Sequence, residues 1–304
     1  MLSAEDNEIL TRVGPGTPMG TLLRRYWIPA CLSSEIGEPD GAPVRVRLLG
    51  EDLVAFRDTA GAVGLIEERC PHRGASLFYG RNEESGLRCT YHGWKFDVSG
   101  QCTDQRSEIR SFAHRIKTTS YPVHESGGIV WAYLGPPAAM TPFRDFGTDS
   151  LPSSLVGANK ETIYCNWVQS LDGDLDTAHI SNLHQFDAID DIADDGTDKP
   201  GSYSGIADFR SQDAMATETA GPIFDRTAEH LGSTDVALIR MHRLLLRAAK
   251  ALADDPAAAD LPALAGPDAG DFRAIRGAEK ILAGGEDWRY LGTDADPTVR
   301  EALG

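Results

Sequence analysis

Two stretches decide the fold of this chain: Cys70-Pro71-His72-Arg73-Gly74 and Cys89-Thr90-Tyr91-His92-Gly93-Trp94. Each stretch carries one cysteine and one histidine beside a Pro or Gly that favours a tight turn. Two cysteines and two histidines on two such loops suit a [2Fe–2S] cluster in which two thiolates bind one iron and two imidazoles bind the other. Because neutral imidazoles replace anionic thiolates, this ligand set raises the potential of the cluster above that of an all-cysteine ferredoxin.

The competing interpretation is a structural zinc site, since two cysteines and two histidines also suit tetrahedral zinc. Zinc fingers more often pair cysteine with cysteine and histidine with histidine, whereas each of these loops holds one of each. We therefore predict that Cys70, His72, Cys89 and His92 bind a [2Fe–2S] cluster. Their pattern, C-x-H…C-x-x-H, resembles the Rieske motif.

Composition argues against several classes of protein. The 304 residues predict about two domains, and a hydrophobic content of 41% is enough for packed cores. A formal net charge of −17 argues against binding to nucleic acid or to an anionic membrane. No apolar run approaches the length of a membrane span, so we expect neither a signal peptide nor a transmembrane helix. We expect Cys31, Cys102 and Cys165 to be small buried residues in a reducing cytoplasm.

Periodicity divides the chain into three parts. Residues 1–25 form an arm with helical pieces, and residues 26–137 consist of strands and turns up to Pro136-Pro137. Alternating apolar and polar residues and flanking turn signals predict four strands, at 44–48, 53–56, 63–66 and 129–134. The predicted fold class is α+β, with an N-terminal all-β Rieske [2Fe–2S] domain followed over residues 138–304 by a helix-rich domain, which the family resemblance given below implies is a shortened catalytic domain.

Helices are expected in the third part, at residues 166–181 and 225–231. Ser233 follows Gly232 and can cap a longer helix. That helix places its apolar residues on one face and its basic residues on another. The apolar residues are Leu238, Met241, Leu245, Ala249 and Leu252. We interpret it as a packed helix with a solvated basic face rather than as a docking surface for an electron donor. Residues 251–270 are expected to form a tail or linker.

The stretch from Asp176 to His184 has the form D-x-x-H-x-x-x-x-H. Asp176 and His179 are three residues apart and would share one helical face. His179 and His184 are five residues apart, about 140° around a regular helix, so the helix must end or bulge between them if both bind one metal. Two histidines and one carboxylate with open positions form the facial triad of non-haem Fe(II) oxygenases.

Together the two motifs resemble those of the catalytic α subunit of Rieske non-haem iron aromatic-ring oxygenases. Four further stretches look like the phthalate-dioxygenase-type branch of that family, at residues 10–20, 24–29, 166–169 and 221–227. The resemblance extends from residue 10 to about residue 250.

This resemblance implies a role for each candidate residue. Cys70, His72, Cys89 and His92 would hold the cluster. His179 and His184 would hold the catalytic Fe(II) together with Asp213, which follows a Gln and precedes a helix; Asp208 is the alternative third ligand. Asp176 would be a bridging acid that hydrogen-bonds a histidine ligand of the iron and a cluster histidine of the neighbouring subunit.

The resemblance also implies an activity. The chain would use O2 and electrons from a partner reductase or ferredoxin to hydroxylate or O-demethylate an aromatic carboxylate substrate. It would work in the cytoplasm as a closed homotrimer, in which the cluster of one subunit faces the iron of the next.

One departure from the family keeps other functions open. In the family a large antiparallel sheet separates the second histidine ligand from the carboxylate ligand and lines the substrate pocket. Here residues 185–212 replace it, and the acidic stretch 190–201 has no strand pattern, as if an internal segment were deleted near residues 201–205. The alternatives are an iron–sulfur electron-transfer protein with an inert oxygenase half, or a truncated product without a settled activity.

Overall fold

The computed structural model describes residues 2–144, 147–151, 155–184, 204–206 and 208–257. The chain divides into two compact units, Met1–Ala265 and Gly266–Gly304, and the second lies outside the described residues. The acidic stretch predicted at 190–201 also lies outside them, as does most of the tail predicted at 251–270.

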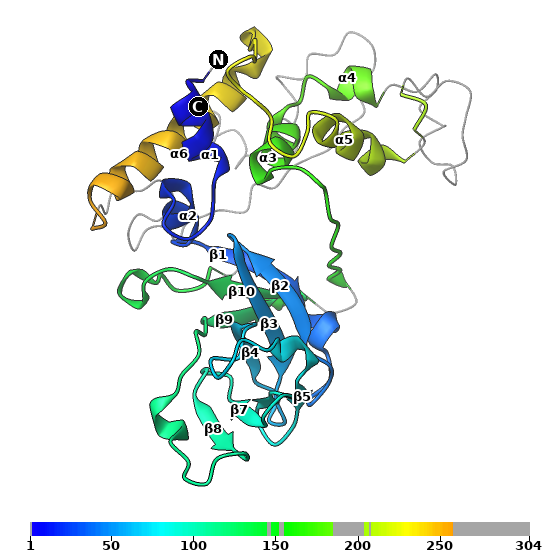
Figure 1. The fold of residues 1–304 in the computed structure, drawn as a ribbon. Helices are drawn as coiled ribbons and strands as arrows, with labels where there is room; N and C mark the ends of the chain where they lie inside the picture. The colour runs from blue at the N-terminus through cyan, green and yellow to red at the C-terminus, as the bar shows by residue number, and fades with distance from the viewer. Residues whose placement is uncertain (1, 145–146, 152–154, 185–203, 207, 258–304) are drawn as a thin grey trace. The chain divides into compact units, whose positions relative to one another are not determined.

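The strands of the described residues form three antiparallel sheets (Figure 1). Their orders are β1-β10-β9, β2-β3-β4 and β5-β6-β7-β8. The strands are β1 Trp27–Leu32, β2 Val44–Leu48, β3 Glu51–Arg57, β4 Val63–Glu67, β5 Arg81–Asn82, β6 Leu87–Arg88, β7 Trp94–Phe96, β8 Cys102–Gln105, β9 Val123–Ser126 and β10 Ile129–Tyr133. The predicted all-β N-terminal domain is confirmed, and each of the four predicted strands lies within two residues of an observed strand at both ends.

Strand β3 is buried on both faces because it separates two apolar cores. Its side chains alternate, so Val54 and Phe56 point into one core while Leu53 and Ala55 point into the other. The first core also contains Cys70 and Cys89 at 2% exposure each, and the second joins β1 and β10 to the β2-β3-β4 sheet. The thiols predicted to bind a cluster therefore lie at the edge of a well-packed core.

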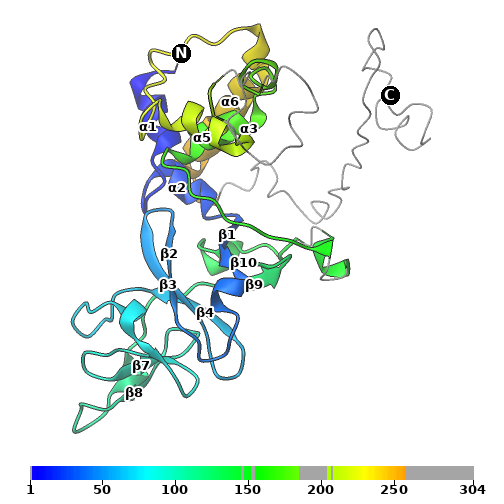
Figure 2. The same ribbon diagram turned by 90° about the vertical axis from the view of Figure 1, so that its right-hand side faces the viewer.

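Six α-helices are described; Figure 1 labels all of them, and Figure 2 shows α1, α2, α3, α5 and α6 in a second view. They are α1 Ala4–Thr11, α2 Pro18–Leu23, α3 Trp167–Leu175, α4 Ile180–Leu183, α5 Phe209–Glu218 and α6 Val236–Asp254. Short 3-10 turns lie at Ser33–Ile36, Leu77–Tyr79, Ala113–Arg115, Pro137–Ala139, Thr148–Ser150 and Ser233–Asp235. None of the helices in this described part is long and apolar enough to span a membrane.

Helix α6 packs through its predicted apolar face. Leu252 and Ala249 are buried in one cluster with Leu10 of α1 and Leu22 of α2. The packed-helix interpretation therefore fits, and the predicted arm of residues 1–25 contributes helices to this core rather than standing apart.

Two helix predictions are corrected. The helix expected over 166–181 ends at Leu175, because Asp176 is extended (φ −78°, ψ 111°) and its side chain accepts a hydrogen bond from the Ala178 N–H at 2.7 Å. Residues 225–231 form turns instead of a helix. There the Asp225 carboxylate accepts bonds from the N–H and hydroxyl of Thr227, which stabilises a turn.

Candidate metal centres

The two cysteine–histidine loops have the same backbone geometry. The Cys70 N–H donates to the Ala75 carbonyl at 2.8 Å, and the Gly74 N–H donates back to the Cys70 carbonyl at 2.8 Å. In the second loop Cys89 donates to Trp94 at 2.8 Å, and Gly93 donates to Cys89 at 3.0 Å. The turns require a left-handed residue, and Gly74 and Gly93 supply it with φ of +73° and +76°.

The two cysteine sulfurs lie close enough to hydrogen-bond to each other. This bond lowers the pKa of the Cys89 thiol and raises that of Cys70. The backbone N–H groups of Tyr91 and His92 also point at the Cys89 sulfur and favour its thiolate. Because the thiolate is the form that binds metal, the buried end of the site suits an iron bound through sulfur.

The two histidines lie side by side nearer the surface. Their ring centroids are 4.4 Å apart, and the Trp94 ring stacks on His72 at 4.4 Å with an interplanar angle of 10°. Two thiols and two imidazoles, one of each on either loop, are the ligand set of a [2Fe–2S] cluster that divides its ligands between two irons.

The buried Arg88 side chain binds the backbone of the second cysteine–histidine loop. Its guanidinium is 0% exposed, donates to the Gly93 carbonyl at 2.8 Å, and also binds Asp104 at 2.7 Å and Glu83 at 2.6 Å. It therefore ties the cluster loop to β8 and to the turn after β5.

Replacing Arg88 with methionine is expected to lower the free energy of unfolding by about 1–3 kcal/mol, because the Gly93 carbonyl and the two carboxylates lose hydrogen bonds from a charged donor. Urea denaturation measures this change, and acid-labile sulfide measures loss of the cluster. The control is Arg81→Met, since the Arg81–Glu83 pair is largely exposed and should contribute less than about 1 kcal/mol. Equal stability of the two variants would contradict the supporting role of Arg88.

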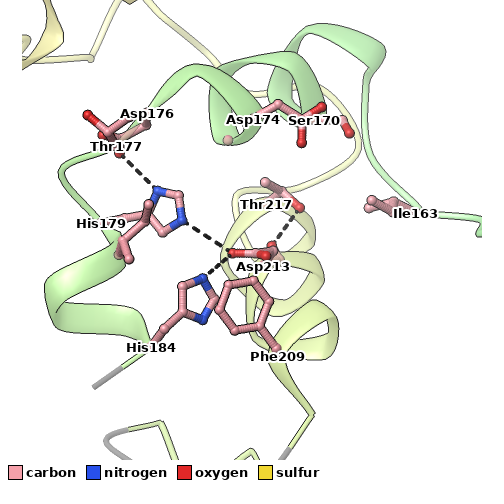
Figure 3. Close-up of a pocket in the computed structure, with 12 residues that line it drawn as sticks. Ile163, Ser170, Asp174, Asp176, Thr177, His179, His184, Phe209, Asp213 and Thr217 are labelled. Carbon is pink, nitrogen blue, oxygen red and sulfur yellow. Dashed lines mark hydrogen bonds and ion pairs between the residues drawn. The ribbon is translucent and has the colours of Figure 1, made fainter. Parts of the chain in front are cut away.

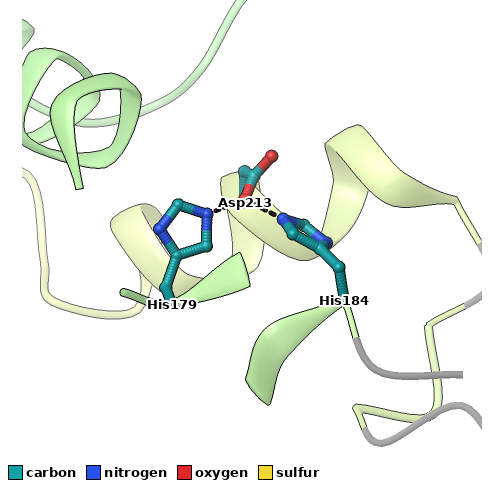
Figure 4. A group of neighbouring side chains, drawn as sticks. All are labelled: His179, His184 and Asp213. Carbon is teal, nitrogen blue, oxygen red and sulfur yellow. Dashed lines mark ion pairs between the residues drawn. The ribbon is translucent and has the colours of Figure 1, made fainter. Parts of the chain in front are cut away.

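The second centre is built where helix α3 stops and helix α5 begins. His179 precedes the four-residue helix α4 and His184 follows it, so the two rings face the same point although they are five residues apart (Figure 3). Asp213, in the second turn of α5, points at the same place (Figure 4). Its Oδ1 lies 3.4 Å from His179 Nε2 and 3.0 Å from His184 Nε2, and all three ligand atoms lie within 4.8 Å of one another.

Both imidazoles point Nε2 toward Asp213 and Nδ1 away from it. His179 Nδ1 faces Asp176 Oδ2 at 3.6 Å, and His184 Nδ1 is 2.7 Å from Gln212 Oε1. His184 Nε2 is buried and makes no hydrogen bond, although it lies close to the carboxylate. A buried nitrogen without a hydrogen bond, beside a second imidazole and a carboxylate, is the donor set expected of a non-haem Fe(II) site. These residues therefore fit the predicted iron.

A cavity of about 210 Å³ opens beside the three ligand atoms. Its lining includes two further carboxylates, Asp174 and Asp176, together with Thr217 and Phe209. Small-molecule sites are typically about 300–1,000 Å³, so this cavity is smaller than a typical substrate pocket.

Asp208, the alternative third ligand, has another role. It is the N-cap of α5 and accepts a hydrogen bond from the Ser211 N–H at 2.7 Å; the Ser211 hydroxyl and then this N–H lower the pKa of its carboxyl. Sequence reasoning missed Gln212 and Phe209, whose ring stacks on His184 at 3.7 Å. The available signal for Phe209 was its spacing, since it lies one turn before Asp213 on the same face of α5.

Comparison with known proteins shows that the segments carrying the two centres match two known domain families. The Rieske [2Fe–2S] domain matches residues 26–119, and the domain described as LigXa C-terminal domain like matches residues 132–197 and 189–302. The oxygenase subunit of phthalate 4,5-dioxygenase from Pseudomonas putida is 50% identical over 62% of this chain and 44% of its own length. The oxygenase subunit of tert-butanol monooxygenase / tert-amyl alcohol desaturase from Aquincola tertiaricarbonis is 35% identical over 98% of this chain and 62% of its own length.

Among solved structures, dicamba monooxygenase bound to dicamba matches with 30% identity and a TM-score of 0.49, covering 56% of this chain and 52% of its own. The chain thus spans less than half the length of the phthalate relative and under two thirds of the tert-butanol relative.

Proposed function

This chain belongs to the Rieske non-haem iron oxygenases, and from that premise we propose that it is the oxygenase component of a multi-component system. It would use O2 and electrons from a reductase or ferredoxin to hydroxylate or O-demethylate an aromatic carboxylate. The observation that supports this best is the convergence of His179, His184 and Asp213 on one point beside an open cavity.

Each ligand residue has a definite task in this proposal. Cys70, Cys89, His72 and His92 would hold the [2Fe–2S] cluster, and His179, His184 and Asp213 would hold Fe(II). When bound, the cluster supplies single electrons and the iron activates O2. The chain itself contributes ligation, orientation of the imidazoles and partial exclusion of water, since His184 is buried while His179 and Asp213 are 24% and 37% exposed at their side chains.

The assembly is part of the same proposal. A closed homotrimer would bring the cluster loops of one copy to Asp176 of the next, since a head-to-tail interface closes as a ring. Asp176 is suited to this contact because its side chain is 28% exposed and lies beside His179. A cytoplasmic location is supported by the cysteines, all of which are free thiols.

The alternative is an iron–sulfur electron-transfer protein whose oxygenase half is inert. The short connection over residues 185–212 favours it, but an inert half would have no need to hold two imidazole nitrogens and a carboxylate oxygen within 4.8 Å. We therefore favour the oxygenase.

Metal analysis of the purified chain tests the proposal. We expect about three irons and two acid-labile sulfides per chain, since one [2Fe–2S] cluster and one Fe(II) would be bound. Two irons and two sulfides would favour the electron-transfer alternative, and zinc without sulfide would exclude both. Phthalate, the substrate named for the Pseudomonas putida relative, is the first probe of turnover.

A further inference from the structure

We propose that Gln212 is a positioning residue that holds His184 with its proton on Nδ1, so that Nε2 is free to bind the metal before any metal arrives. The inference rests on the proposed iron site and adds to it a residue that does not touch the iron. Gln212 is 1% exposed, and its amide is the neighbour of His184 on the side away from Asp213.

The hydrogen bonds of Gln212 determine which way its amide points. Its Nε2 donates to the Ile206 carbonyl at 2.5 Å, which leaves Oε1 to face His184. His184 Nδ1 lies 2.7 Å from that oxygen. Because an amide oxygen only accepts, Nδ1 must carry the ring proton in the neutral imidazole, and the lone pair is then on Nε2.

Helix α5 holds His184 from two further directions. Phe209 stacks on the ring with centroids 3.7 Å apart and an interplanar angle of 17°. Asp213 approaches Nε2 at 3.0 Å. Phe209, Gln212 and Asp213 are spaced i, i+3 and i+4, so one face of the helix supplies the ring support, the amide and the carboxylate.

His179 is held less firmly. Its Nδ1 is 3.6 Å from Asp176, both side chains are about a quarter exposed, and water can replace that contact. The buried Gln212–His184 bond has no such substitute, because neither partner is open to solvent. Loss of the Gln212 acceptor should therefore leave a buried N–H without a partner or turn the ring away from the metal.

The protonation of His184 can be read directly by NMR. In the wild-type chain freed of mononuclear metal by a mild chelator, histidine-selective 15N labelling and two-bond 1H–15N couplings distinguish the two neutral tautomers. We expect His184 to be protonated at Nδ1. A proton on Nε2 would overturn the inference.

Metal affinity gives the second readout, with Co(II) titrated calorimetrically into the same apo-site protein. Gln212→Leu should weaken Co(II) binding by about 10- to 100-fold, the usual loss when an outer partner of a histidine ligand is removed. Gln212→Glu keeps an acceptor for His184 Nδ1 but loses the donor to the Ile206 carbonyl, so its Co(II) affinity should lie between those of wild type and Gln212→Leu. An equal loss in both variants would refute the positioning role.

The matched control is Gln169→Leu. Gln169 is another buried glutamine, whose Nε2 donates to the Thr217 and Gly221 carbonyls at 2.9 Å each, so it ties α3 to the end of α5 without touching a ligand. Its removal should reduce stability while Co(II) affinity stays near wild type. If Gln169→Leu weakens Co(II) as much as Gln212→Leu, general loosening is the cause and the inference fails. If wild type binds no Co(II), the proposed iron site fails, and the tautomer measurement alone decides the role of Gln212.

Discussion

Replacing Asp213 with alanine is expected to remove the mononuclear iron, so that iron content falls from about three to about two per chain while sulfide stays at two. The reason is that Asp213 Oδ1 is the only carboxylate oxygen that faces both imidazoles in the described part of the chain. Loss of a direct ligand should exceed the loss of an outer partner, so metal affinity should fall by at least about 100-fold, and product formation with it. Elemental analysis and calorimetry measure these changes.

Asp208→Ala is the matched control for Asp213→Ala. Asp208 lies on the same helix and was the rival ligand, but its carboxylate caps the helix at the Ser211 N–H. This variant should keep three irons and lose only a little helix stability. If Asp208→Ala loses the iron and Asp213→Ala keeps it, the assignment of the third ligand is wrong.

Replacing Asp176 with asparagine is expected to leave both metals bound and to slow product formation by about 10- to 100-fold, as loss of an outer carboxylate partner does at other metal sites. Asparagine keeps the shape of the side chain and the turn contact with Ala178. It removes the negative charge that faces His179 Nδ1. In the proposed trimer, the same carboxylate would also hydrogen-bond a cluster histidine of the neighbouring subunit. Single-turnover measurements on the pre-reduced chain separate this step from substrate binding.

Asp174→Asn controls for charge alone. Asp174 lines the same cavity and carries the same charge, but among the described residues His179 forms its ion pairs with Asp176 and Asp213 and not with Asp174. Near-normal turnover in Asp174→Asn beside slow turnover in Asp176→Asn supports a specific role of Asp176. Equal slowing in both variants would point to the summed charge of the cavity, and normal turnover in Asp176→Asn would refute the bridging role.

Prediction of the helix and strand bounds from the sequence was most accurate where the local hydrophobic pattern agrees with the tertiary packing. Strand β2 has the predicted bounds because its alternation matches the burial of a strand with one face on the core. The helix was expected to end or bulge between His179 and His184, but α3 ends at Leu175, before both residues, and the two histidines flank the separate four-residue helix α4. The ligand roles of these residues and the domain boundaries stay predictions, because they depend on metals and on chain positions that the fold alone does not test.

The features that the sequence did not predict depend on hydrogen bonds of polar side chains, either to the nearby backbone or to residues distant in the sequence. The helix expected over 166–181 ends early because the Asp176 carboxylate bonds to the Ala178 N–H instead of leaving the backbone helical. Gln212 could not be found by periodicity, since a buried glutamine is indistinguishable from an exposed one until its partner, far along the chain, is known. Contacts of this kind are set by tertiary structure.

The construction of the second centre from the residues around α4 and one face of α5 has a consequence for protein engineering. Residues 176–184, Ile206 and residues 208–213 together hold both imidazoles, the carboxylate, the stacked ring and the amide with its carbonyl partner. A designer who transplants only the three ligands into a new scaffold would leave the imidazoles free to rotate, whereas grafting these short segments as a cassette would carry their orientation along with them.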